Sequence, residues 1–234
     1  MTHHISKAVI VSHGQPGDPE PQEQAIRDLA ARVAAESPGC EVRGATLAMP
    51  GALADACDDH SLIYPMFMAE GWFTGTQLPR KLAEAGAANA RIMRPFGTDP
   101  ALPPLIVRLA HGAAAEQGWA PNDTTLLLTA HGSGRSQASF NITSALADLI
   151  APHFARVVTG FVEQDPFIAD AARGLARAVS LPFFALRAEH VTDDLPQALD
   201  QAGFDGPRLQ PIGLAPEVPA IIADALRREI SSLK

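Results

Sequence analysis

The stretch Thr124–Gly134, TTLLLTAHGSG, decides both the fold of this chain and the place of its chemistry. Its first part, Thr125–Thr129, is a short apolar run with a preference for β-structure, and a helix-like segment follows its glycines. Such a run predicts a buried strand of a parallel sheet. His131 then stands at the carboxyl edge of that strand, which is where ligands bind in open α/β sheets.

The same phrase occurs earlier in the chain. Ala8–Gly14, AVIVSHG, is also an apolar run that ends in His-Gly. Three further pairs of phrases repeat at nearly the same distance: Pro65-Met-Phe-Met with Pro182-Phe-Phe-Ala, Leu78-Pro79 with Leu195-Pro196, and Pro95-Phe-Gly97 with Pro211-Ile-Gly213. Several matches in one register indicate two homologous units. We place their boundary at the linker-like segment Gly118–Asp123, which gives an N-terminal lobe over residues 1–118 and a C-terminal lobe over residues 119–234.

Strands and helices alternate in the predicted order of elements. Strands are expected at Ala8–Ser12, Glu41–Leu47, Ser61–Met68, Arg91–Met93, Thr125–Thr129, Arg156–Val162, Ser180–Leu186 and Arg208–Gln210. Helices are expected at Glu23–Glu36, Pro50–Cys57, Gly75–Ala85, Ala101–Gln117, Ser136–Phe154, Pro166–Ala178, Asp194–Ala202 and Ala215–Ile230. This alternation predicts an α/β fold with two similar lobes, each a parallel β-sheet flanked by helices.

Composition and charge restrict the classes of function. The 234 residues are 47% hydrophobic and 19% charged, as in ordinary globular proteins. The net charge of −8 argues against a nucleic-acid surface, which would be basic. The sequence contains no apolar run of membrane-spanning length and no apolar core of a signal peptide, so we expect a cytoplasmic protein without a membrane span. Neither GxxxxGK[ST] nor GxGxxG occurs, so no nucleotide cofactor is expected.

Polar residues at the predicted strand ends are concentrated in the second unit. There the strands are followed by His131, by Glu163 and by the segment Arg187–His190. The corresponding positions of the first unit, Leu47 and Phe73, are apolar. We therefore expect one main site, built chiefly by the second unit. Imidazole and carboxylate groups suit a divalent first-row metal, and a neutral imidazole can also accept a proton.

The same residues also have purely structural interpretations. Glu70 and Glu163 could be solvated acids in loops, and Ser133 could cap the helix that follows it. Trp72 and Phe73 could form the wall of a cleft or belong to an ordinary core. The sequence around Ser133 is not the GxSxG nucleophile elbow, so a hydrolase triad is not expected.

Two phrases of the second unit together resemble the class II tetrapyrrole chelatases, and among them the CbiX-type sirohydrochlorin chelatases. They are Thr129–Arg135, TAHGSGR, and Pro182–Pro196, PFFALRAEHVTDDLP. The segment Phe161-Val-Glu163, followed by Pro166, is also similar to that family. The resemblance covers the second unit from end to end and the first unit in its skeleton.

This resemblance implies a lyase that inserts Co²⁺ or Fe²⁺, with Ni²⁺ as a further candidate, into a sirohydrochlorin-like tetrapyrrole during cobalamin or siroheme biosynthesis. It implies that His131 and His190 bind the metal ion and help to remove pyrrole protons, in a cleft between the lobes. An acid of the opposite lobe assists, and Glu70 is the candidate. The candidates for contact with the tetrapyrrole are Ser133, Glu163, Trp72 and Phe73.

The first unit keeps His13 and Glu70, but Phe73 stands where the second unit has His190, so its site is expected to be degenerate. Two other functions stay open. One is a non-catalytic protein that carries metal or tetrapyrrole in the same cleft, and the other is a periplasmic-type solute binder with two lobes. The protein could be a monomer or a homodimer.

Overall fold

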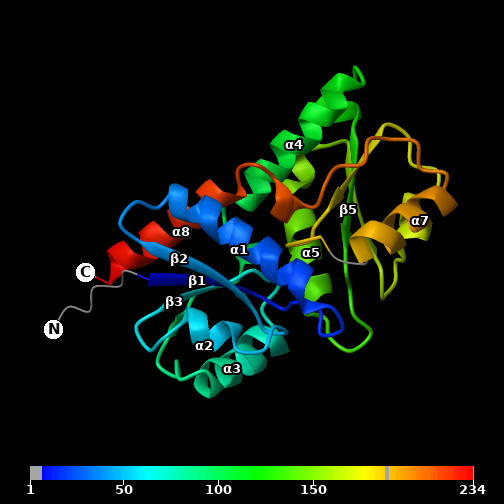
Figure 1. Ribbon diagram of the computed structural model, residues 1–234. Coiled ribbons are helices and arrows are strands. Elements are labelled where there is room, and N and C mark those ends of the chain that lie inside the picture. Colours follow the sequence, from blue (N-terminus) through cyan, green and yellow to red (C-terminus); the bar gives the residue numbers. More distant parts are fainter. Residues whose placement is uncertain (1–6, 188–189, 234) are drawn as a thin grey trace. The chain divides into compact units, whose positions relative to one another are not determined.

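Parallel strands form two separate sheets in the computed structural model, which describes residues 7–187 and 190–233 (Figure 1). The first sheet has the strand order β2-β1-β3-β4, and the second has the order β6-β5-β7. Every pair of neighbouring strands is parallel. The predicted fold class, with two parallel sheets flanked by helices, is therefore confirmed.

The first compact unit comprises residues 1–99 and 216–234. Its strands are β1 (Lys7–Ser12), β2 (Glu41–Thr46), β3 (Leu62–Pro65) and β4 (Arg91–Ile92). Its helices are α1 (Pro19–Ala35), α2 (Ala52–Ala56), α3 (Leu78–Glu84) and α8 (Val218–Ser232). Helices α1 and α8 lie on one face of the sheet, and α2 and α3 lie on the other (Figure 1). Strand β1 is buried on both faces, which explains its continuous apolar sequence.

The second compact unit comprises residues 100–215. Its strands are β5 (Thr125–Ala130), β6 (Arg156–Phe161) and β7 (Ala178–Pro182). Its helices are α4 (Leu102–Glu116), α5 (Ala138–Ile150), α6 (Ile168–Ala172) and α7 (Leu195–Gln201). Its apolar core between sheet and helices joins Leu127 of β5 to Ile168 of α6 and to Leu195 and Leu199 of α7.

The compact units exchange the closing helices of the two sequence repeats. Helix α4 ends the first repeat but packs on β7 and α5, and α8 ends the second repeat but packs on α1. Helix α8 buries a stripe that includes Val218, Ile222 and Leu226, and an ion pair joins its Glu229 to Arg91 of β4. The compact units therefore have other bounds than the repeats 1–118 and 119–234.

Local backbone geometry repeats between the units. A π-helical turn at Phe73–Gln77 leads into α3, and another at His190–Asp194 leads into α7, at the spacing of the sequence repeat. A Cβ atom at Gly97 would collide with the carbonyl oxygen of Met68, and one at Gly213 would collide with that of Ala185. Only glycine allows these close approaches, which explains why the same residue type stands at both positions.

Most element boundaries differ from the predictions by a few residues, and β3, α3, α5 and β7 are among them. Three other differences concern α1, α6 and the last predicted strand. Helix α1 begins at Pro19 rather than at Glu23, because its prolines lie in the first turn, where proline is tolerated. Helix α6 covers only Ile168–Ala172 instead of Pro166–Ala178, because Gly174 has a φ of 70° and the chain then turns into β7. The strand predicted at 208–210 is reduced to one parallel bridge between Ser180 and Arg208. Among the described helices, none has both the length and the apolar composition needed to cross a membrane.

Candidate functional site

His131 directly follows β5, at the carboxyl edge of the second sheet. Its side chain is partly exposed, and its Nδ1 lies 2.7 Å from the carbonyl oxygen of Gly132. A carbonyl oxygen can only accept a hydrogen bond, so Nδ1 carries the proton of the neutral ring and the lone pair lies on Nε2. Metal-binding histidines show this arrangement, because their second ring nitrogen donates to a carbonyl or carboxylate group.

Glu163 lies beside His131 at the end of the neighbouring strand β6. The Glu163 backbone N–H donates to the His131 carbonyl oxygen over 2.9 Å, and carboxylate Oε2 lies 3.7 Å from His131 Nδ1. Gly132 permits this approach, since its φ is 73° and a Cβ there would collide with side-chain atoms of Phe161 and Gln164. The predicted pair of an imidazole and a carboxylate is thus brought together in the second unit.

Two residues that the sequence analysis missed hold the loop after His131. Gln164 Oε1 accepts a hydrogen bond from the Ser133 backbone N–H over 2.7 Å, and Ser139 Oγ accepts one from the Gly132 N–H over 3.2 Å. Ser133 Oγ accepts a hydrogen bond from the Arg135 backbone N–H and so stabilises a turn before α5. Lone Gln and Ser residues give no pattern by which these contacts could have been found.

His190 begins the π-helical turn before α7. The preceding strand β7 lies beside β5, so the segment leading to His190 starts next to the strand that carries His131. The side chain of His190 falls outside the described residues, and so does the prediction that both imidazoles can share one ion. Among the described side chains, no group of three or more His, Cys, Asp or Glu residues could hold a metal ion.

The corresponding edge of the first unit carries aromatic residues and one ion pair. Trp72 is 60% exposed and Phe73 is 36% exposed, so neither belongs to an ordinary core. The ring of His13 lies 4.4 Å from that of Phe73, and loss of solvation by burial lowers the pKa of His13. Glu70 is exposed, and its carboxylate lies 3.0 Å from Arg94 Nε.

The structural match of Glu163 in the first unit is Ala48 rather than Leu47. The Ala48 N–H donates to the His13 carbonyl oxygen, just as the Glu163 N–H donates to that of His131. The count along the sequence missed this by one residue, because no repeated phrase fixes the register of β2 against β6. The match is apolar in either case, so only the second unit has an acid at this position.

The sequence of this chain matches the model of one protein family over most of its length. The model of the CbiX family matches residues 7–112 and, again, residues 125–229. The chain belongs to the CbiX family. Both repeats of this CbiX protein thus contain the family's β/α unit, with the polar edge described above in the second.

Solved structures agree with this assignment. A CbiX described as the terminal enzyme for biosynthesis of siroheme in denitrifying bacteria is 58% identical, with a TM-score of 0.91 over 95% of this chain and 98% of that one. SirB from Bacillus subtilis with Fe³⁺ is 14% identical and has a TM-score of 0.74 over 97% of this chain and 96% of its own. The sirohydrochlorin chelatase SirB from Bacillus subtilis subspecies spizizenii, in complex with cobalt, is 14% identical and has a TM-score of 0.68 over 97% and 95%. These two share the fold. The comparison with curated proteins gives no match.

Proposed function

We propose that this CbiX protein is a sirohydrochlorin chelatase that inserts Fe²⁺ or Co²⁺ into the tetrapyrrole. The observation that carries the proposal is the orientation of His131, whose Nδ1 is bound to the Gly132 carbonyl while Glu163 lies beside the ring. The 58% identical CbiX acts in siroheme biosynthesis, which supports the same reaction class here. A cytoplasmic location and a monomeric or dimeric state are further predictions.

The reaction requires a site that both binds the ion and accepts protons. Insertion of a divalent ion replaces the protons of pyrrole N–H groups in the macrocycle. The Nε2 lone pair of neutral His131 can bind the metal substrate, and after transfer of the ion the same atom can accept a proton. The Glu163 carboxylate, 3.7 Å from Nδ1, would then stabilise the positive charge of the ring.

The other assigned residues complete the proposal. We assign His190 as the second ligand of the metal ion and Glu70 as a further proton acceptor. Exposed Trp72 and Phe73 offer flat apolar surface of the kind that a macrocycle can cover. We assign Ser133 and Glu163 to the tetrapyrrole-binding edge of the second sheet, and the first unit is expected to bind metal weakly or not at all.

The proposal also concerns which metal ion the protein inserts. Imidazole ligands suit iron, cobalt and nickel, so the residues alone do not select among them. The role of the 58% identical relative in siroheme biosynthesis favours Fe²⁺. SirB proteins of the same fold have been observed with Fe³⁺ and with cobalt, which keeps Co²⁺ as a substrate to be tested.

The test is anaerobic incubation of sirohydrochlorin with Fe²⁺, Co²⁺ or Ni²⁺ and a small molar fraction of protein. A chelatase converts the whole tetrapyrrole to its metal complex, which the absorbance spectrum follows. A carrier would change only a stoichiometric fraction and release no product, and that result would overturn the proposal. His153→Ala is the matched control for His131→Ala, because His153 lies at the opposite end of the sheet, just before β6.

A further inference from the structure

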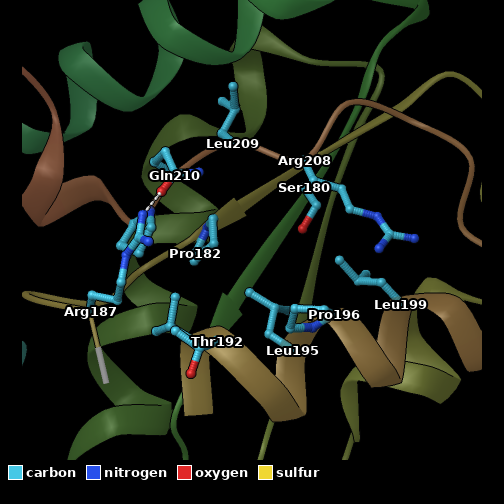
Figure 2. Close-up of a pocket in the computed structure, with 12 residues that line it drawn as sticks. Ser180, Pro182, Arg187, Thr192, Leu195, Pro196, Leu199, Arg208, Leu209 and Gln210 are labelled. Atoms are coloured by element: carbon cyan, nitrogen blue, oxygen red, sulfur yellow. Dashed lines mark hydrogen bonds between the residues drawn. The ribbon is translucent and has the colours of Figure 1, made fainter. Parts of the chain in front are cut away.

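A pocket of about 270 Å³ lies in the second unit between β7, α7 and the segment 208–211 (Figure 2). Ser180 and Pro182 of β7 lie between Arg187 and Gln210 on one side and Arg208 on the other. Helix α7 closes the pocket with Leu195 and Leu199. The strand register matches Ser180 to Ile63 of the first unit, a fully buried core residue.

The Ser180 side chain places a buried hydroxyl group at this pocket. Its exposed fraction is 1%, and its Oγ makes no hydrogen bond among the described residues. A buried hydroxyl without a partner lowers the stability of the fold, whereas Ile63 in the first unit packs into an apolar core. A bound polar group would satisfy this hydroxyl.

Arg187 brings a positive charge to the same pocket. Its Nη2 donates to Gln210 Oε1 over 2.6 Å, and no ion pair of Arg187 occurs in the part of the chain that the structure describes. The positive charge of Arg208 is compensated, because this side chain pairs with Asp200 over 2.7 Å and donates to the Phe204 carbonyl oxygen. Among the described arginines that line this pocket, Arg187 is therefore the one without an acidic partner.

The first unit has the opposite charge at the position of Arg187. Glu70 lies the same number of residues before its π-helical turn as Arg187 does, and it pairs with Arg94 over 3.0 Å. Arg94 matches Gln210, since Met93 and Leu209 make the same backbone hydrogen bond to Ile63 and Ser180. An acid–base pair in the first unit is thus replaced by a cation and a neutral amide in the second.

We propose that this pocket binds a carboxylate-bearing side chain of the tetrapyrrole, an inference that rests on the proposed function. Arg187 donates charged hydrogen bonds to the carboxylate, and the Gln210 amide nitrogen donates another. The Ser180 hydroxyl donates a further hydrogen bond from β7. Ligand sites that enclose a drug-sized molecule measure about 300–1,000 Å³, so this smaller pocket suits a side arm rather than the macrocycle.

The location and the net charge of the protein support this ligand. Val191 and Thr192 line the pocket and directly follow His190, the candidate metal ligand, so an arm bound here would hold the ring near the metal site. Sirohydrochlorin is polyanionic, and the net charge of this protein is −8. A local cation is needed to offset the resulting repulsion.

Two substitutions test the pocket. Arg187→Gln removes the charge, and Ser180→Ala removes the hydroxyl while retaining the space. Binding of metal-free sirohydrochlorin is measured by tetrapyrrole fluorescence, and the insertion kinetics are measured in the absorbance assay. We expect Arg187→Gln to raise Kd and KM for the tetrapyrrole by about tenfold, with kcat and the KM for the metal little changed. The control is Arg156→Gln, an exposed arginine of β6 outside the pocket.

Salt dependence and thermal stability separate a binding role from a structural one. Binding by the wild type should weaken with ionic strength more steeply than binding by Arg187→Gln, because one charge contact is missing from the variant. Ser180→Ala should weaken binding a few fold while Tm stays equal or rises, since no hydrogen bond of the described structure is lost.

The outcomes distinguish this inference from the proposed function. If the wild type inserts metal and Arg187→Gln binds sirohydrochlorin as tightly and with the same salt dependence, the pocket does not hold a carboxylate. If the wild type binds the tetrapyrrole more tightly than Arg187→Gln does but inserts no metal, the chelatase proposal is wrong. The proposed carboxylate-binding pocket is then still supported.

Discussion

The carboxyl edges of the two sheets have the same backbone plan but different side chains. Each edge has a histidine after its central strand, a glycine with positive φ, and a π-helical turn before a short helix. The matched residues, first unit before second, are Ala48 and Glu163, Ile63 and Ser180, Glu70 and Arg187, and Phe73 and His190. At three of these four positions the first unit has an apolar residue, namely Ala48, Ile63 and Phe73, so the fold does not require a polar residue there. The polar residues Glu163, Ser180 and His190 of the second unit therefore point to function.

The largest effect is expected from the histidines of the second unit. His131→Ala and His190→Ala should each lower kcat/KM for metal insertion by roughly 100-fold or more. Loss of an outer partner of a metal-binding histidine typically costs about 10–100-fold, and loss of a ligand should cost at least as much. The metal-insertion assay measures the effect, with His153→Ala as the control. Near-normal activity of His131→Ala in a folded protein would contradict the proposed site.

A smaller loss is expected at Glu163, where the first unit has alanine. Glu163→Ala removes the carboxylate beside His131 Nδ1 but leaves the Gly132 carbonyl to orient the ring. We expect roughly a tenfold fall in metal affinity or insertion rate, at unchanged Tm because the side chain is exposed. Asp170→Ala, another exposed acid of the second unit, is the matched control. An equal effect of both substitutions would indicate general electrostatics instead of a specific contact.

The repeat and the strand ends could be predicted from the sequence, because repeated phrases fix the register wherever they occur. Between Gly14 and Pro65 no phrase is repeated, and there the predicted match of Glu163 was wrong by one residue. The exchange of α4 and α8 could not be predicted either, since an apolar stripe shows that a helix packs but not on which sheet.

The environments of single polar residues also could not be predicted from the sequence. Gln164 orders the loop after His131 through one hydrogen bond to Ser133, and one glutamine after a strand carries no pattern. The Ser180 hydroxyl, which has no hydrogen-bond partner among the described residues, could not be predicted either, because a serine in a predicted strand has no distinguishing pattern. The hydrogen bond of Gln164 joins residues far apart in the chain, and the surroundings of Ser180 depend on the shape of a pocket, so both require the three-dimensional structure.

His13 allows a sharper test of the difference between the units. His13→Ala should lower metal insertion only a few fold, because its neighbour Phe73 occupies the position that His190 has in the second unit. At most, His13 shapes the edge or supports a second and weaker metal site. The same assay with His131→Ala alongside measures the ratio of the two effects. If both variants were equally impaired at equal stability, the main site would not belong to the second unit alone.

The smallest effect concerns stability at low pH. Partial loss of solvation lowers the pKa of His13 from its ordinary value of 6.5. The unfolded chain therefore binds a proton at this residue more tightly than the native state does. The native state should therefore lose stability as the pH falls below about 6.5 towards the lower native pKa, with no contribution from His13 at higher pH. His13→Gln does not titrate, so its urea midpoint should fall less than that of the wild type between about pH 7.5 and pH 5.5. The size of the difference is limited, because the His13 side chain is exposed. An unchanged acid dependence in His13→Gln would mean that the native environment does not lower the pKa of His13.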